Sequence, residues 1–130
     1  MNGNVKSRLF IYLGKSHFSI EPQFAYLFTT TTKFEYYSKN GVRKNNSYLV
    51  FKKGEYCFNK KCILDIDSGL NEINLSLLEN NNKIVVKDKI SEVKLKEIYS
   101  LILNSSIAKV KKIDIHSSYN YDGITGLKRP

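Results

Sequence analysis

The last third of the chain carries the clearest hydrophobic pattern. Four apolar residues there recur at the i, i+3, i+4 and i+7 positions of one helical face: Leu95, Ile98, Tyr99 and Ile102. This spacing predicts an amphipathic helix. Asp88 or Ser91 can cap its start, and the Asn-Ser-Ser sequence at 104–106 ends it. Glu92 precedes Lys96 by four residues, which favours the same helix through an ion pair.

The residues after this helix alternate between apolar and polar side chains, as those of a strand do. Over 110–118, Ile113 and Ile115 point to one side. The polar side chains that alternate with them are Lys112, Asp114, His116 and Ser118. We therefore expect one helix followed by one final strand.

Short runs of aromatic and β-branched residues fill the upstream part of the chain. Strands are expected over 8–14, 24–37, 48–52, 56–58, 62–66, 73–77 and 83–87. Asn40 and Gly41 suit a type I′ turn and predict a hairpin. The predicted fold class is α+β: a mostly antiparallel sheet of hairpins and meanders, packed against one main helix in the C-terminal third.

Length and composition indicate a single globular domain over 1–130. The chain is 42% hydrophobic and 25% charged, with only two prolines and no segment that reads as a linker. No apolar run approaches the roughly 20 residues of a membrane helix, and the N-terminus has too few apolar residues for a signal peptide. We expect a cytoplasmic protein, or a domain of a larger one, that does not bind membranes.

Positive charge is concentrated in the first half of the chain. Of the net +9, most lies in residues 1–60, which hold ten Lys/Arg against three Glu, and 13 of the 16 aromatic residues. Basic side chains among Tyr and Phe favour a surface that follows a nucleic-acid backbone and stacks on bases. The other interpretation is that the aromatic residues form the core and the lysines protect exposed strands. The candidate binding residues are Lys33, Tyr37, Arg43, Lys44, Tyr48, Lys52 and Lys53.

The two histidines share a local motif, because each is followed two residues later by a serine. His17 precedes Ser19, and His116 precedes Ser118, each pair on a predicted strand. The pattern resembles the two-histidine phosphoesterases, whose signature is a pair of His-x-Thr/Ser motifs on facing strands. The resemblance implies a metal-independent phosphodiesterase acting on RNA ends or on cyclic or 2′,5′-linked nucleotides. The histidines would be the acid–base pair, and the serines would bind the phosphate.

Between these alternatives, the sequence favours binding over catalysis. The main hypothesis is a small basic interaction domain whose partner is an acidic macromolecule, either a protein or a nucleic acid. The Asn-, Lys- and Ile-rich composition is typical of an AT-rich genome, a phage or a mobile element, where such domains serve as inhibitors, immunity proteins or anti-defence factors. The oligomeric state stays open.

No cofactor or metal is expected from the sequence. Cys57 and Cys62 flank a short predicted turn, and free thiols are expected in the cytosol. Asp65, Asp67 and Glu72 form the densest acidic group, where turn caps are expected rather than a calcium loop.

Overall fold

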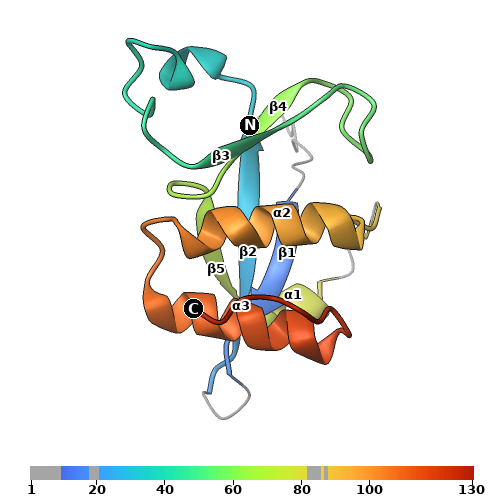
Figure 1. The fold of residues 1–130 in the computed structure, drawn as a ribbon. Helices are drawn as coiled ribbons and strands as arrows, with labels where there is room; N and C mark the ends of the chain where they lie inside the picture. Colours follow the sequence, from blue (N-terminus) through green and yellow to red (C-terminus); the bar gives the residue numbers. More distant parts are fainter. Residues whose placement is uncertain (1–9, 18–20, 82–85, 87) are drawn as a thin grey trace.

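The computed structural model describes residues 10–17, 21–81, 86 and 88–130. Its strands are β1 (Phe10–Lys15), β2 (Phe24–Thr31), β3 (Tyr48–Phe51), β4 (Cys62–Asp65) and β5 (Leu70–Asn74). Its helices are the 3₁₀ helix η1 (Phe34–Tyr37) and the α-helices α1 (Leu75–Glu79), α2 (Glu92–Leu103) and α3 (Lys109–Tyr121). The five strands form an antiparallel sheet against which the C-terminal helices pack, which confirms the predicted α+β class (Figure 1).

Strand β2 is the centre of the sheet. It pairs with β1 on one side, from Phe10↔Thr29 to Lys15↔Ala25. On the other side its first part pairs with β5 and its last two residues pair with β4, and β4 also pairs with β3. The sheet therefore has two halves: β1-β2-β5 lies behind α2 and α3 in Figure 1, while the β3–β4 hairpin extends beyond them.

Helix α2 forms as the pattern predicts. The Ser91 side chain accepts a hydrogen bond from the backbone N–H of Lys94 and caps the helix start. Lys96 and Glu92 form the expected ion pair at 3.4 Å. Ile98, Tyr99 and Ile102 are buried against the sheet. The predicted helix is confirmed.

The predicted final strand is wrong, because residues 109–121 form helix α3. Of the two alternating isoleucines, Ile115 is fully buried but Ile113 is 44% exposed. The buried set is Asp114, Ile115 and Tyr119, which is helical spacing. The Lys112 ammonium donates to the carbonyls of Leu103 and Ser105, so it satisfies backbone groups at the end of α2.

Polar contacts attach α3 to the sheet. The Tyr26 hydroxyl of β2 donates to Asp114 at 2.7 Å in the core. At the end of β1, the Ser118 hydroxyl accepts from the backbone N–H of Lys15 at 3.1 Å. Gly14 allows this approach, because its φ is +143° and a Cβ there would lie 2.9 Å from the Ser118 hydroxyl oxygen.

Several upstream predictions also need correction. The predicted strand over 73–77 ends at Asn74, whose side chain caps α1. The predicted strand over 24–37 ends at Thr31 and is followed by η1, and residues 56–58 form turns rather than a strand. Asn40 and Gly41 lie in the turns between η1 and β3, not in a hairpin, since β2 and β3 do not pair. Of the predicted strand over 83–87, only residue 86 lies within the described residues.

The core lies between the sheet and the two long helices. Strands β1 and β2 contribute Ile11, Leu13, Tyr26 and Phe28, and the helices contribute Ile98, Tyr99, Ile102, Ile115 and Tyr119. The hairpin adds Phe51, Phe58, Cys62 and Leu64. The hairpin is thus fixed to the rest of the fold through one continuous apolar cluster.

Candidate functional site

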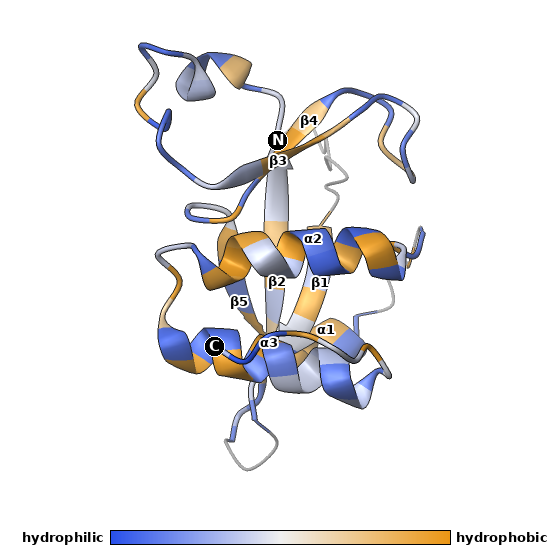
Figure 2. Ribbon diagram, in the orientation of Figure 1, coloured by the Kyte–Doolittle hydropathy of each residue, from blue (hydrophilic) through white to orange (hydrophobic). Residues whose placement is uncertain are grey.

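The candidate surface is a segment that we call the basic arm, residues 33–61. It contains η1, β3 and their connecting loops, and it extends past the part of the sheet that α2 and α3 cover (Figure 1). Much of its connecting chain is hydrophilic in Figure 2, while β3 and β4 carry apolar residues. Against two glutamates, it carries eight cationic residues: Lys33, Lys39, Arg43, Lys44, Lys52, Lys53, Lys60 and Lys61.

The lysines of the basic arm are exposed and carry uncompensated charge. All seven are exposed, and within the residues that the structure describes none of them forms an ion pair. In the helical part, Lys94 pairs with Glu97 at 3.2 Å, Lys96 pairs with Glu92, and Lys111 pairs with Glu72. The positive field of the arm is therefore directed to solvent.

The structure places most of the predicted binding residues on this surface. Lys33, Lys44, Lys52 and Lys53 are exposed, and Tyr48 is 37% exposed. Tyr37 was also predicted to bind the partner, but it is only 8% exposed and does not belong to an accessible surface. Three further exposed lysines of the arm were absent from the prediction, although the same count of charges would have found them: Lys39, Lys60 and Lys61.

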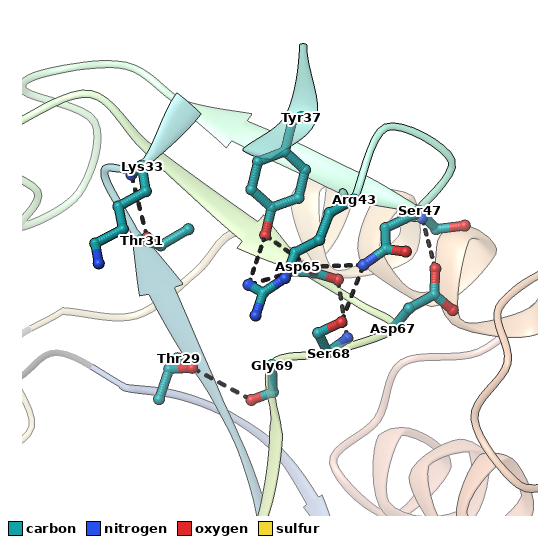
Figure 3. Close-up of polar contacts among 11 residues, drawn as sticks. Thr29, Thr31, Lys33, Tyr37, Arg43, Ser47, Asp65, Asp67, Ser68 and Gly69 are labelled. Carbon is teal, nitrogen blue, oxygen red and sulfur yellow. Dashed lines mark hydrogen bonds and ion pairs between the residues drawn. The ribbon is translucent and has the colours of Figure 1, made fainter. Parts of the chain in front are cut away.

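Asp65, at the end of β4, attaches the arm to the sheet (Figure 3). Its carboxylate accepts hydrogen bonds from the Tyr37 hydroxyl at 2.6 Å and from the Asn46 amide at 3.0 Å. The Ser68 N–H donates to the second oxygen at 2.9 Å, and the Arg43 guanidinium lies 4.0 Å away. Since Asp65 is only 2% exposed, these partners compensate a buried charge. Arg43 and Tyr37 are therefore structural residues of the junction.

Burial and the hydrogen bond to Asp65 raise the pKa of Tyr37, while Arg43 opposes that rise. The hydroxyl of Tyr37 therefore stays protonated at neutral pH and remains a donor. At the junction, the Tyr37 hydroxyl is the donor and the Asp65 carboxylate is the acceptor, with the Arg43 guanidinium at the edge.

Asp67 makes a second attachment, between the start of β3 and the loop joining α2 to α3. One carboxylate oxygen accepts from the Ser47 N–H at 2.6 Å (Figure 3). The other accepts from the backbone N–H and the hydroxyl of Ser106, at 2.8 and 2.7 Å. Burial by itself would raise the pKa of Asp67, but these hydrogen bonds and the charge of Lys112 hold it below its usual 3.8.

The turn after Asp65, which contains Asp67, interrupts the pairing of β2. The partner of Thr30 is Leu64, whereas the partner of Phe28 is Leu70, so residues 66–69 form a bulge between β4 and β5. A Cβ on Gly69 would lie 2.5 Å from the Asp65 carbonyl oxygen, so the bulge needs glycine there. Of the acidic group, only Asp65 caps this turn, through the Ser68 N–H; Asp67 joins distant segments, and Glu72 lies on β5 and pairs with Lys111.

Most aromatic rings of the arm are buried or lie beside a cation. Lys33 and Arg43 lie 5.7 and 5.5 Å from the ring centre of Tyr36, and Lys61 lies 5.1 Å from that of Phe34. Among the buried rings, Phe51 and Phe58 are 4.8 Å apart. The expected base-stacking platform is therefore not formed by these rings.

The histidine motif at 116–118 does not take the form that the phosphoesterase resemblance requires. His116 and Ser118 lie on helix α3, where residues two apart do not share a face. Ser118 is engaged with the backbone of Lys15 and Asp114. The His116 ring contacts the Leu127 carbonyl at 3.3 Å and lies 5.8 Å from the ring of Tyr99. His17 follows β1 and is exposed, and Ser19 lies outside the described residues.

Other candidate chemistry is absent from the part of the chain that the structure describes. Cys57 is exposed and Cys62 is buried, both as free thiols, and burial raises the pKa of Cys62. Within residues 10–17, 21–81, 86 and 88–130, no three His, Cys, Asp or Glu residues are grouped to hold a metal ion. Over those same residues, no helix combines the length and apolar character needed to cross a membrane.

The geometry describes an α+β domain with a basic arm, and the comparisons with known proteins add one relative. The chain is similar to the DNA polymerase III subunit delta of Buchnera aphidicola subsp. Schizaphis graminum (strain Sg), with 34% identity over 94 residues. The match covers 68% of this chain and 28% of that protein, so the chain spans less than a third of the relative's length. No family model matches the chain, and no solved structure matches it.

Proposed function

We propose that this chain is a non-catalytic binding module of a DNA-replication assembly, in which the basic arm binds a negatively charged macromolecule. The observation that carries the proposal is the similarity to a subunit of DNA polymerase III over 68% of the chain. A subunit works by contact with other macromolecules, and the exposed, unpaired lysines of the arm supply a surface for such contact. A place beside a DNA polymerase also agrees with the expected cytoplasmic location.

The similarity directs the proposal to replication rather than to the inhibitor, immunity or anti-defence roles that the composition suggests. The binding part of the original hypothesis is kept, with Lys33, Lys44, Tyr48, Lys52 and Lys53 as its exposed residues. The phosphodiesterase alternative is not carried forward, because its strand-borne motif at 116–118 is helical.

Reconstitution tests the proposed assembly role. The chain is mixed with the purified DNA polymerase III subunits of its own organism and analysed by size-exclusion chromatography with light scattering. We expect co-elution with at least one subunit. If every subunit elutes at its own mass over the accessible range of protein concentration, the assembly role is contradicted.

A variant of the arm locates the contact. Replacing Lys33, Lys44, Lys52 and Lys53 by Gln removes four positive charges from an exposed surface, so the fold is retained. A control that replaces Lys89, Lys96, Lys109 and Lys128 by Gln removes the same charge from exposed positions outside the arm. If the arm provides the contact, only the first variant weakens co-elution.

A further inference from the structure

We propose that the partner of the basic arm is the phosphate backbone of DNA, bound as a duplex and without base preference. This inference rests on the proposed function, because it names the chemical class of the negatively charged partner. It is argued from the kind of cation, the state of the aromatic rings and the distribution of charge along the arm.

The cations of the arm suit phosphates better than a protein surface. Seven of the eight are lysines, a residue type depleted at protein–protein interfaces, where arginine and aromatic residues provide the anchors. The single arginine, Arg43, is engaged with Tyr37 and Asp65. Lysine contacts phosphate as a point charge and releases condensed counterions from DNA.

The arm also offers few apolar anchors for a protein partner. Its exposed large hydrophobic side chains are Val42, at 86%, and Tyr48, at 37%. Tyr48 already packs edge-on against Tyr37, with ring centres 5.0 Å apart. A protein interface of standard size needs a desolvated apolar centre, and the arm does not present one.

Base recognition is disfavoured by the aromatic rings. Tyr36 and Phe34 are covered by cations of the arm, and Phe51 and Phe58 are buried. Single-strand binding by stacking requires open aromatic faces, and the most exposed ring of the arm, Tyr48, packs edge-on against Tyr37. We therefore expect the arm to contact phosphates. Because a duplex has a higher charge density than a single strand, the arm should bind the duplex more tightly.

The lysines are distributed for an extended polyanion rather than for a small anion. Lys33 and Lys44 lie on the η1 side of the arm, and Lys52, Lys53, Lys60 and Lys61 lie in the loop between β3 and β4, at the opposite side in Figure 1. That loop is held by a hydrogen bond from the Gly54 N–H to the Phe58 carbonyl at 2.8 Å. Glu55 also accepts from the Lys52 N–H at 2.8 Å. The loop that carries the second group of charge is therefore held by its own hydrogen bonds before binding.

Fluorescence anisotropy with a labelled duplex of about 20 base pairs tests the proposal. We expect binding at about 50 mM salt that weakens steeply as salt rises, with a log–log slope near 0.9 per phosphate contact. Replacing Lys33, Lys44, Lys52 and Lys53 by Gln should weaken binding at least about tenfold and lower the slope by about 3–4. The control replacing Lys89, Lys96, Lys109 and Lys128 should change binding by less than about threefold.

Three results would overturn the proposal. The first is no binding of the unmodified chain at low salt, with circular dichroism showing that it is folded. The second is an equal loss in the arm and control variants, which would mean a response to net charge alone. The third is tighter binding of polyglutamate or of oligo-deoxythymidine than of the duplex, which would indicate an acidic protein or a stacked single strand as the partner.

This experiment is separable from the assembly test. If the chain co-elutes with polymerase subunits and does not bind the duplex, only the DNA inference fails. If it binds the duplex by the arm but associates with no subunit, the assembly role fails and the DNA inference stands.

Discussion

The basic arm and the helix-covered part of the fold use charge in opposite ways. Four of the five lysines on α2 and α3 pair with glutamates or satisfy carbonyl groups, as Lys111 does with Glu72 and Lys112 does with Leu103. In the arm, no lysine forms an ion pair within the described residues. Most of the lysine charge on the two helices is engaged within the fold, whereas the lysine charge of the arm is available to a partner.

The junction between the two regions shows how the arm keeps its place without using its lysines. Asp65 and Asp67 make the polar attachments, and Phe51 and Phe58 make the apolar one. We therefore expect that the lysines of the arm can be substituted with little effect on stability, whereas substitutions of the junction residues destabilise the fold. Four predictions test this contrast, from the largest expected effect to the smallest.

Replacing Ile98 by Ala should destabilise the fold most. Ile98 is fully buried between α2 and the sheet, and such a truncation costs about 2–5 kcal/mol through lost contacts and a residual cavity. Urea denaturation followed by circular dichroism measures the free energy of unfolding. A loss below about 1 kcal/mol would show that α2 does not carry the core.

Replacing Asp65 by Asn should loosen the arm before the helices. The substitution removes the charge and one acceptor, so Tyr37, Asn46 and Ser68 can no longer all be satisfied, at a cost of about 1–3 kcal/mol. Hydrogen exchange should become faster at the amides of 36–47 while those of α2 stay protected. Equal acceleration in both regions would mean that the arm and the helices open as one unit.

Replacing Asp67 by Asn should have a smaller effect that depends on pH. Because the pKa of Asp67 is lower in the folded chain than its usual 3.8, the ionised carboxylate stabilises the fold above that pH. This stabilisation is lost when the pH falls below the pKa that Asp67 has in the folded chain. We expect the substitution to cost about 1–2 kcal/mol at pH 7 and to cost less at about pH 3. The same cost at both values would contradict the role of the charge.

Replacing Lys96 by Gln should have a small effect on stability. Its ion pair with Glu92 is exposed, and such pairs contribute about 0.3–0.5 kcal/mol. Replacing Lys44 by Gln, in the arm, should leave the free energy of unfolding unchanged within about 0.5 kcal/mol. A larger loss at Lys44 would show a structural contact of that lysine and would weaken the contrast.

The sequence predicts features that depend on local spacing. Helix α2 follows from the repeat of Ile98, Tyr99 and Ile102 and from the cap at Ser91, all within one segment. Exposure of Lys44 and Lys52 follows from their charge alone. The class of fold also follows, because aromatic and β-branched runs precede a long amphipathic helix.

The features that the sequence does not predict depend on contacts distant along the chain. Helix α3 was predicted as a strand because Ile113 and Ile115 alternate, and only packing against the sheet distinguishes the exposed side chain from the buried one. Tyr37 was predicted to be a binding residue, but it is buried and its hydroxyl donates to Asp65, 28 residues away. The histidine motif at His116 fails for the same reason as the strand that carried it.

The most direct test of the contrast between the two regions is a titration followed by amide chemical shifts. The ¹⁵N-labelled chain is titrated with a short unlabelled DNA duplex at low salt, and shift changes are mapped by residue. We expect changes concentrated in 33–61, including the amides of Lys44, Lys52 and Lys53, with α2 and α3 nearly unchanged. Changes centred on the exposed faces of α2 or α3, or none at any duplex concentration, would contradict a fold whose free charge lies in the arm.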